Sequence, residues 1–298
     1  MILRLRIAIA ILILTGLSTL VLHAQQLDQA IPGIQSAIQK SGADVAVAFR
    51  TLDGKSQWFS REHESFHAAS TMKIPVMIEL FHQVREGKLN LDDPLTIHNE
   101  FHSIVDGSVY KLDISDDSDA VLYRLEGQTQ TLAQLCEAMI TKSSNFAANL
   151  LIEKLGVENI RATVHQLGAD EMCVLRGVDD QKAFDQGLNN ATSAYALLTL
   201  LTAIADGTAV DADSSRHMVE ILQRQTFNEG IPAGLPPGTP VAHKTGEITK
   251  IHHDAAIVYA PRPFILVILV RGLADRKDSA ALMAEITRQL YAGTETPR

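Results

Sequence analysis

Apolar residues follow one spacing at the two ends of the chain and another in the middle. Short apolar or β-branched runs separated by turn residues are typical of strands. Near the N-terminus these runs are residues 44–51 and 56–59, and Asp53-Gly54 between them is a strong hairpin signal. Near the C-terminus the predicted strands are 241–245, 255–259 and 264–270. The chain is therefore expected to form strands at both of its ends.

The middle of the chain carries apolar residues at helical spacing. A helix is expected to follow from Ser70, because the apolar residues from Met72 to Phe81 fall on one broad side. Further helices are predicted at 132–140, 145–155, 157–167, 193–205 and 215–224, and two more at 27–38 and 278–291. Residues 89–127 are polar and rich in Asp and Gly, which predicts loops with short elements.

This order of elements favours an α+β fold. We expect an antiparallel sheet unit, flanked by the N- and C-terminal helices, with an all-helical unit inserted into it. One catalytic domain would cover residues 25–298, with the sheet unit at about 25–69 and 226–298 and the helical unit at about 70–225. A cleft between two such units is a natural place for a binding site.

The first 24 residues have the layout of a signal peptide. Arg4 and Arg6 precede an apolar run from Ile7 to Leu22, and polar sequence begins after Ala24. We expect cleavage after Ala24, export to the periplasm or the medium, and no stable membrane insertion afterwards. An uncleaved membrane anchor is the alternative, since the apolar run is only slightly short for a membrane span.

Composition narrows the choice of partners. The chain has 298 residues and a formal net charge of -9, without a run rich in Lys or Arg. This charge argues against nucleic acid and against anionic membrane surfaces, so a small-molecule partner and a monomer are expected. Cys136 and Cys173 are too few for a disulfide framework, and no Cys/His cluster has zinc-ligand spacing. No metal or other cofactor is expected.

Ser70 and Lys73 form the first of three short motifs that could carry chemistry. At the start of a helix their spacing of three places both side chains on one face. A serine hydroxyl needs a neighbour that takes its proton, and a desolvated lysine can do so. Taken alone, the spacing is weak evidence, because Ser70 could simply cap a helix.

Two further motifs follow in the chain, Ser143-Ser144-Asn145 and Lys244-Thr245-Gly246. The hydroxyl of Ser143 could pass a proton to a leaving group, and the Asn145 amide could bind a substrate amide. Lys244 and Thr245 could hold a substrate carboxylate, while a glycine lets a ligand approach the backbone. Ser143-Ser144-Asn145 could instead be an ordinary helix cap, and Lys244-Thr245-Gly246 an ordinary strand end at the surface.

The order and context of the three motifs are those of a known family. The chain resembles the class A serine β-lactamase superfamily over nearly its whole mature length, most closely at residues 135–151 around the second motif. The resemblance implies the two-part fold and acylation of Ser70 by a β-lactam or a peptidoglycan stem peptide. It also implies an oxyanion hole made by the backbone N–H groups of Ser70 and Glu247.

The chain departs from the family pattern in the second motif and in one loop. Ser144 stands where the family usually has Asp. The family's lactamases place a Glu four residues before an Asn to activate the deacylating water. Here Asn189 matches the Asn and Asp185 stands at the Glu position. Asp179 and Asp180 are alternatives, or could form a loop-bracing ion pair with the nearby Arg176. The cation that assists carboxylate binding is left open among Arg271, Lys250 and His253.

Three functions follow from this interpretation. The first is a β-lactamase that hydrolyses the β-lactam amide through an acyl-enzyme, with catalytic residues Ser70, Lys73, Ser143 and Asp185 and binding residues Asn145, Asn189, Lys244, Thr245 and Glu247. The second is a D,D-peptidase that acts on cell-wall peptides. The third belongs to another class, a covalent β-lactam binding or sensor domain that does not turn over. The fate of the acyl-enzyme distinguishes them.

Overall fold

The computed structural model describes residues 27–294. The predicted signal peptide and its cleavage point lie outside these residues. Within them, no helix has the length and the apolar character needed to cross a membrane.

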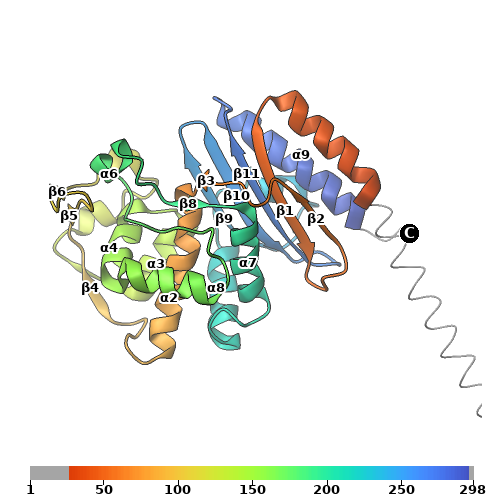
Figure 1. Cartoon of the computed structure of the whole chain (residues 1–298). Coiled ribbons are helices and arrows are strands. Elements are labelled where there is room, and N and C mark those ends of the chain that lie inside the picture. The colour runs from red at the N-terminus through yellow and green to blue at the C-terminus, as the bar shows by residue number, and fades with distance from the viewer. Residues whose placement is uncertain (1–26, 295–298) are drawn as a thin grey trace, which may run out of the picture.

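A five-stranded sheet is built from both ends of the chain (Figure 1). Its strands, in spatial order, are β2 (Gln57–Ser60), β1 (Asp44–Thr51), β11 (Phe264–Arg271), β10 (Ile251–Val258) and β9 (Val241–Ile248). Every neighbouring pair is antiparallel, and β1 pairs with β11 so that Ala48 faces Val267. Gly54 adopts a positive φ of 68° in the predicted hairpin turn, a conformation that glycine tolerates without strain.

Helices cover both faces of this sheet. The helix at residues 27–41 and α9 (Arg276–Thr294) lie side by side on one face (Figure 1). Alternate strand residues such as Val47 and Ile268 pack there against α9. Their neighbours in the strands point to the other face and pack into the core of the helical unit, where α7 (Ala194–Ala205) contacts the sheet. Since both faces are buried, the strands carry nearly continuous apolar runs.

The helical unit comes from the middle of the chain. Its longer helices are α2 (Lys73–Arg85), α3 (Leu132–Thr141), α4 (Asn145–Leu155), α5 (Val157–Gln166), α7 and α8 (Ala212–Gln223). The shorter elements include α6 (Gln181–Asp185), the 3₁₀ helices η1 (Ala69–Met72), η2 (Ile114–Asp116), η3 (Leu122–Leu125) and η4 (Ile231–Gly234), and the strand pairs β3 (Phe66–His67) with β8 (Ala191–Thr192), β4 (Pro94–Thr96) with β7 (Thr129–Thr131), and β5 (Phe101–His102) with β6 (Val109–Tyr110). The predicted α+β arrangement is confirmed.

Some predicted element boundaries differ from the structure. Ser70 lies within the 3₁₀ turn η1, and the α-helix begins at Lys73. Strand β10 begins at Ile251, four residues before the predicted start, because its first polar residues are buried together with the apolar ones. Cys136 is buried and Cys173 half-buried, and both are free thiols in the structure.

Candidate active site

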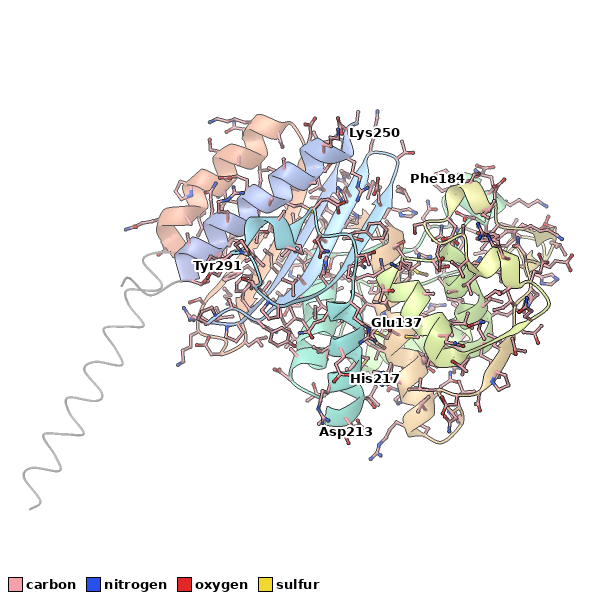
Figure 2. All side chains as sticks on the ribbon, turned by 180° about the vertical axis from the view of Figure 1, so that it is seen from behind. Glu137, Phe184, Asp213, His217, Lys250 and Tyr291 are labelled. Atoms are coloured by element: carbon pink, nitrogen blue, oxygen red, sulfur yellow. The ribbon has the colours of Figure 1, made fainter. Side chains whose placement is uncertain are left out.

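A cavity of about 860 Å³ lies where the sheet unit meets the helical unit. Its wall includes Ser70 from η1, Ser143 before α4, and Thr245 from the edge strand β9. Figure 2 shows the labelled Phe184 on α6 and Lys250 at the β9–β10 turn, and both residues line the cavity from different units. The three sequence motifs therefore meet in one place although they are far apart in the chain.

Ser70 is held at the cavity by an unusual turn. The preceding Ala69 has a left-handed φ of 45°, which is costly for a residue with a Cβ atom. Its backbone N–H donates a hydrogen bond to Nδ1 of His67 at 3.0 Å. The turn leaves the Ser70 side chain half-buried and facing Lys73. Backbone strain of this kind is typical of functional sites, where the surroundings must hold the conformation.

Lys73 lies beneath the cavity and is fully buried. Its Nζ donates to Ser70 Oγ at 3.0 Å, to the carbonyl oxygen of Ser143 at 2.6 Å and to Oδ1 of Asn145 at 2.8 Å. Burial, only partly opposed by the carboxylates of Asp117 and Asp179, lowers the pKa of Lys73 to about 7. A lysine with this pKa has a substantial neutral fraction at neutral pH, so it can accept the Ser70 proton.

Ser143 connects this lysine to a second one. The fully buried Lys244 donates from Nζ to Ser143 Oγ at 2.9 Å and to the carbonyl oxygen of Thr245 at 2.8 Å. Burial holds the pKa of Lys244 well below its usual value, and the positive charge of Lys73 lowers it further. The hydroxyl of Ser143 is thus placed between two proton donors, which suits a group that relays a proton.

The edge strand β9 packs closely against the nucleophile turn. A Cβ atom added at Gly246 would lie 3.1 Å from the backbone nitrogens of both Ser70 and Thr71. Only a glycine permits this approach without displacing one of the two segments. Of the binding residues predicted on this strand, Thr245 and Glu247 line the cavity. Lys244 does not line it and is connected to the site through Oγ of Ser143.

The loop that follows Arg176 closes another side of the cavity. Asn149 on α4 is buried, and its side chain both accepts from Val178 N at 2.7 Å and donates to Val178 O at 3.1 Å. The hydroxyl of Tyr110 also donates to Val178 O at 3.2 Å. Sequence reasoning missed Asn149, although it lies four residues after Asn145 and therefore on the same helix face.

Asp185 is not brought to the cavity. It ends the short helix α6, is exposed, and accepts a hydrogen bond from Gln181 at 2.6 Å. The predicted role of this carboxylate as the deacylating base therefore has no geometric support, because α6 turns it away from Ser70. The carboxylate of Asp180 is also engaged in hydrogen bonds, since it accepts from the hydroxyl of Ser103 and caps α6.

Asp179, like Asp180, lines the cavity. It lines the wall, adopts a left-handed φ of 61°, and has no hydrogen-bond partner among residues 27–294. Desolvation by the surrounding protein raises its pKa, while the charge of Lys73 opposes that rise. A carboxylate that is not hydrogen-bonded and has a raised pKa is a better proton acceptor than one held in an ion pair.

The predicted partners of Arg176 and Asn189 are also revised. Arg176 is bonded to the carbonyl oxygens of Leu188 and Gly177 and to Oδ1 of Asn189, so it forms no ion pair with Asp179 or Asp180. This contact uses Asn189 to brace the loop. The next residue, Asn190, is the one that lines the cavity, and it also bonds the backbone of Arg176.

Besides Arg176, the cavity is lined by one cation predicted to assist carboxylate binding and by one further cation. Arg271 pairs with Asp44 and Glu64, and His253 is buried against the carbonyl oxygen of His67, so neither of them lines it. Lys250 does line the wall. So does Arg276 at the start of α9, which sequence reasoning missed and which lies 3.0 Å from Glu247.

Comparison with known proteins agrees with this geometry. The chain matches the Beta-lactamase enzyme family over residues 28–294 and belongs to that family. It is 23% identical over 273 residues to the extended-spectrum β-lactamase PER-1 of Pseudomonas aeruginosa, covering 87% of this chain and 85% of that one. It is 29% identical over 165 residues to a β-lactamase of Bacillus licheniformis, about half of each chain.

Solved structures share the fold. A β-lactamase from Sphaerobacter thermophilus superposes with a TM-score of 0.76 at 22% identity, covering 88% of this chain and 96% of that one. The protein named PBP-A superposes with a TM-score of 0.74 at 25% identity, covering 87% and 94% of the two chains. The predicted relation to the class A superfamily is confirmed.

Proposed function

We propose that the chain is a serine hydrolase that opens the amide bond of β-lactams through an acyl-enzyme on Ser70. The observation that carries this proposal is the hydrogen-bonded series from Ser70 through Lys73 to Ser143 and Lys244 beside one cavity. It supplies a nucleophile, a proton acceptor of suitable pKa, a relay hydroxyl and a buried cation.

Acylation uses each of these groups. Neutral Lys73 takes the proton of Ser70 as Oγ bonds to the β-lactam carbonyl carbon. The N–H groups of Ser70 and Glu247 stabilise the developing oxyanion. When the ring C–N bond breaks, the proton that Lys73 took from Ser70 passes through the hydroxyl of Ser143 to the ring nitrogen. Lys250 and Arg276 on the cavity wall attract the substrate carboxylate, and Lys244 holds the hydroxyl of Ser143.

Deacylation requires a second proton acceptor. Water attacks the ester carbonyl while its proton passes to the carboxylate of Asp179, and that proton is then delivered to Oγ of Ser70 as the ester C–O bond breaks. The cavity position, the free hydrogen-bonding capacity and the raised pKa of Asp179 support this assignment. The ring-opened acid is the product, and the enzyme returns to its starting state.

A D,D-peptidase acting on peptidoglycan stem peptides is the second candidate. The observation that favours it is that, within the described residues, no carboxylate is hydrogen-bonded to Ser70 or Lys73. A deacylating base is therefore not in direct contact with the acylating pair, and the acyl-enzyme formed with a β-lactam would be slow to hydrolyse. Fold similarity to PBP-A is compatible with this alternative.

One experiment separates these functions. Mature protein is mixed with a chromogenic cephalosporin while hydrolysis and intact mass are followed, with Ser70→Ala as the control. Steady turnover without a persistent adduct supports the lactamase. A lasting adduct without turnover supports the peptidase if a D-Ala-D-Ala peptide is cleaved, and the sensor if it is not. Absence of both hydrolysis and adduct contradicts the proposal.

Export and a monomeric state remain part of the proposal. The N-terminal layout supports export. A periplasmic or secreted lactamase would protect its host from β-lactams. N-terminal sequencing of the protein recovered outside the cytoplasm would test the cleavage after Ala24.

A further inference from the structure

A carboxylate from a distant loop caps the helix that carries the second motif. The first residue of α4 is Asn145, and its backbone N–H donates to Asp117 Oδ1 at 3.1 Å. The next N–H, of Phe146, donates to Asp117 Oδ2 at 2.9 Å. The side chain of Ser144, the N-cap residue, accepts a hydrogen bond only from Ala147 N, at 3.2 Å. Asp117 thus completes the cap, and its negative charge lies at the positive end of the helix dipole.

The position of Asp117 is itself well defined. Its carboxylate also accepts from the backbone N–H of Asp119 at 3.0 Å and from the hydroxyl of Tyr123 at 3.2 Å. The adjacent Ser118 donates from Oγ to the carbonyl oxygen of Lys142 at 2.6 Å, which ties the same loop to the segment just before Ser143. Two neighbouring loop residues therefore hold both sides of the second motif.

This segment holds Lys73 in place. The Ser143 carbonyl and Asn145 Oδ1 account for two of the hydrogen bonds made by Lys73 Nζ. Ser143 has a left-handed φ of 57°, so its carbonyl points at Lys73 only while its neighbours restrain the backbone. The ties made by Asp117 and Ser118 supply such a restraint.

We propose that Asp117 is a positioning residue for acylation. Its carboxylate, brought from the 113–119 loop, takes the place of an acidic residue within the motif, where this chain has Ser144. It fixes the two groups that hold Lys73 beside Ser70, and it places a negative charge close to Lys73. This inference rests on the proposed function of the Ser70–Lys73 pair.

The electrostatic part of the role gives a specific sign. The carboxylates of Asp117 and Asp179 are the charged groups that act on Lys73, and the nearby Lys244 is itself acted on by the charge of Lys73. Asp117 raises the pKa of Lys73 against the effect of burial. Removal of the Asp117 carboxylate lowers the pKa of Lys73. The acidic limb of the pH–rate profile, where the acylation rate falls because Lys73 becomes protonated, therefore moves to lower pH. A purely structural role would lower the rate and leave the limb in place.

The test is the second-order rate constant of Ser70 acylation by a chromogenic cephalosporin, measured against pH. Asp117→Asn should slow acylation on the order of tenfold to a hundredfold, because small misplacements of reacting groups are costly. Its acidic limb should lie below that of the wild type. Asp113→Asn is the matched control, since that carboxylate bonds only Ser115 in the same loop. An unchanged Asp117→Asn rate, or a slower rate with an unmoved limb, overturns the inference.

A relocated charge provides the second test. In Asp117→Ser the acylation rate should fall. The double variant that also carries Ser144→Asp should acylate at least tenfold faster than Asp117→Ser alone, because a carboxylate is returned to the start of α4. A double variant no faster than Asp117→Ser contradicts the inference, even if Asp117→Asn proves hard to purify. Since the wild type is measured in parallel, its failure to acylate would count against the proposed function instead.

Discussion

The ammonium nitrogen of Lys244 lies 2.9 Å from the hydroxyl oxygen of Ser143, and the carbonyl oxygen of the same serine lies 2.6 Å from Lys73 Nζ. Two fully buried lysines therefore meet at one residue. The positive charge of Lys73 lowers the pKa of Lys244, and burial lowers the pKa of both lysines. Both side chains therefore lose a proton more readily than a lysine in water.

The pH dependence of acylation should report the protonation state of Lys73. Neutral Lys73 is the acceptor, and its pKa is about 7, so the acylation rate should be flat above that pH and fall roughly tenfold per unit below it. Stopped-flow acylation by a chromogenic cephalosporin between pH 5 and 9 measures the profile. Circular dichroism at each pH excludes unfolding as the cause. A rate independent of pH over this range would remove Lys73 as the acceptor.

Replacement of Asp179 should separate acylation from deacylation. In Asp179→Asn the acylation rate should change little, while turnover falls roughly a hundredfold or more, as for other general bases. Intact-mass measurements should then show the acyl-enzyme accumulating on Ser70. Asp185→Asn, the matched control at the C-terminal end of α6, should keep wild-type turnover. The assignment fails if Asp179→Asn turns over normally, or if Asp185→Asn is the variant that accumulates adduct.

Gly246→Ala tests the contact between the sheet edge and the nucleophile. The added methyl group would lie 3.1 Å from two backbone nitrogens, so β9 or η1 must move by a few tenths of an ångström. We expect acylation to slow by about tenfold or more and the free energy of unfolding to fall by about 1–3 kcal/mol. Thermal unfolding distinguishes a displaced site from an unfolded protein. Wild-type acylation in a fully folded variant would contradict the close packing.

The sequence predicted elements well where one physical signal dominated. Helices α4 and α5 lie within a residue of their predicted bounds, since apolar periodicity and the left-handed Gly156 both mark the boundary. Strand β10 was predicted too short. Its first residues include Asp254, a charged group buried through hydrogen bonds to His243 and to the backbone of Ile231. Burial of that kind depends on tertiary partners that a local pattern does not contain.

The acylating groups were predictable for a different reason. Ser70 and Lys73 are close in sequence, and three motifs in order identified the rest. The loop carboxylate was not predictable by counting back from Asn189, because α6 and the Asn149 contact with Val178 decide which side chain faces the cavity. Asp117 gave no local signal at all, since its role exists only through contacts 28 and 29 residues away.

The sheet is closed by its own chain ends, and this has a consequence for biosynthesis. Strand β1 pairs with β11, and Asp44 lies opposite Arg271 in that pair. The β1–β11 ladder therefore cannot form until Arg271 has been synthesised. Pairings this distant in sequence form slowly, and unpaired edges attract other chains meanwhile. The edge strand β9 carries Lys244 and joins the sheet only through β10 and β11. A chain still being synthesised therefore cannot assemble the site, and reactivity toward β-lactams should begin only once the last strand is complete.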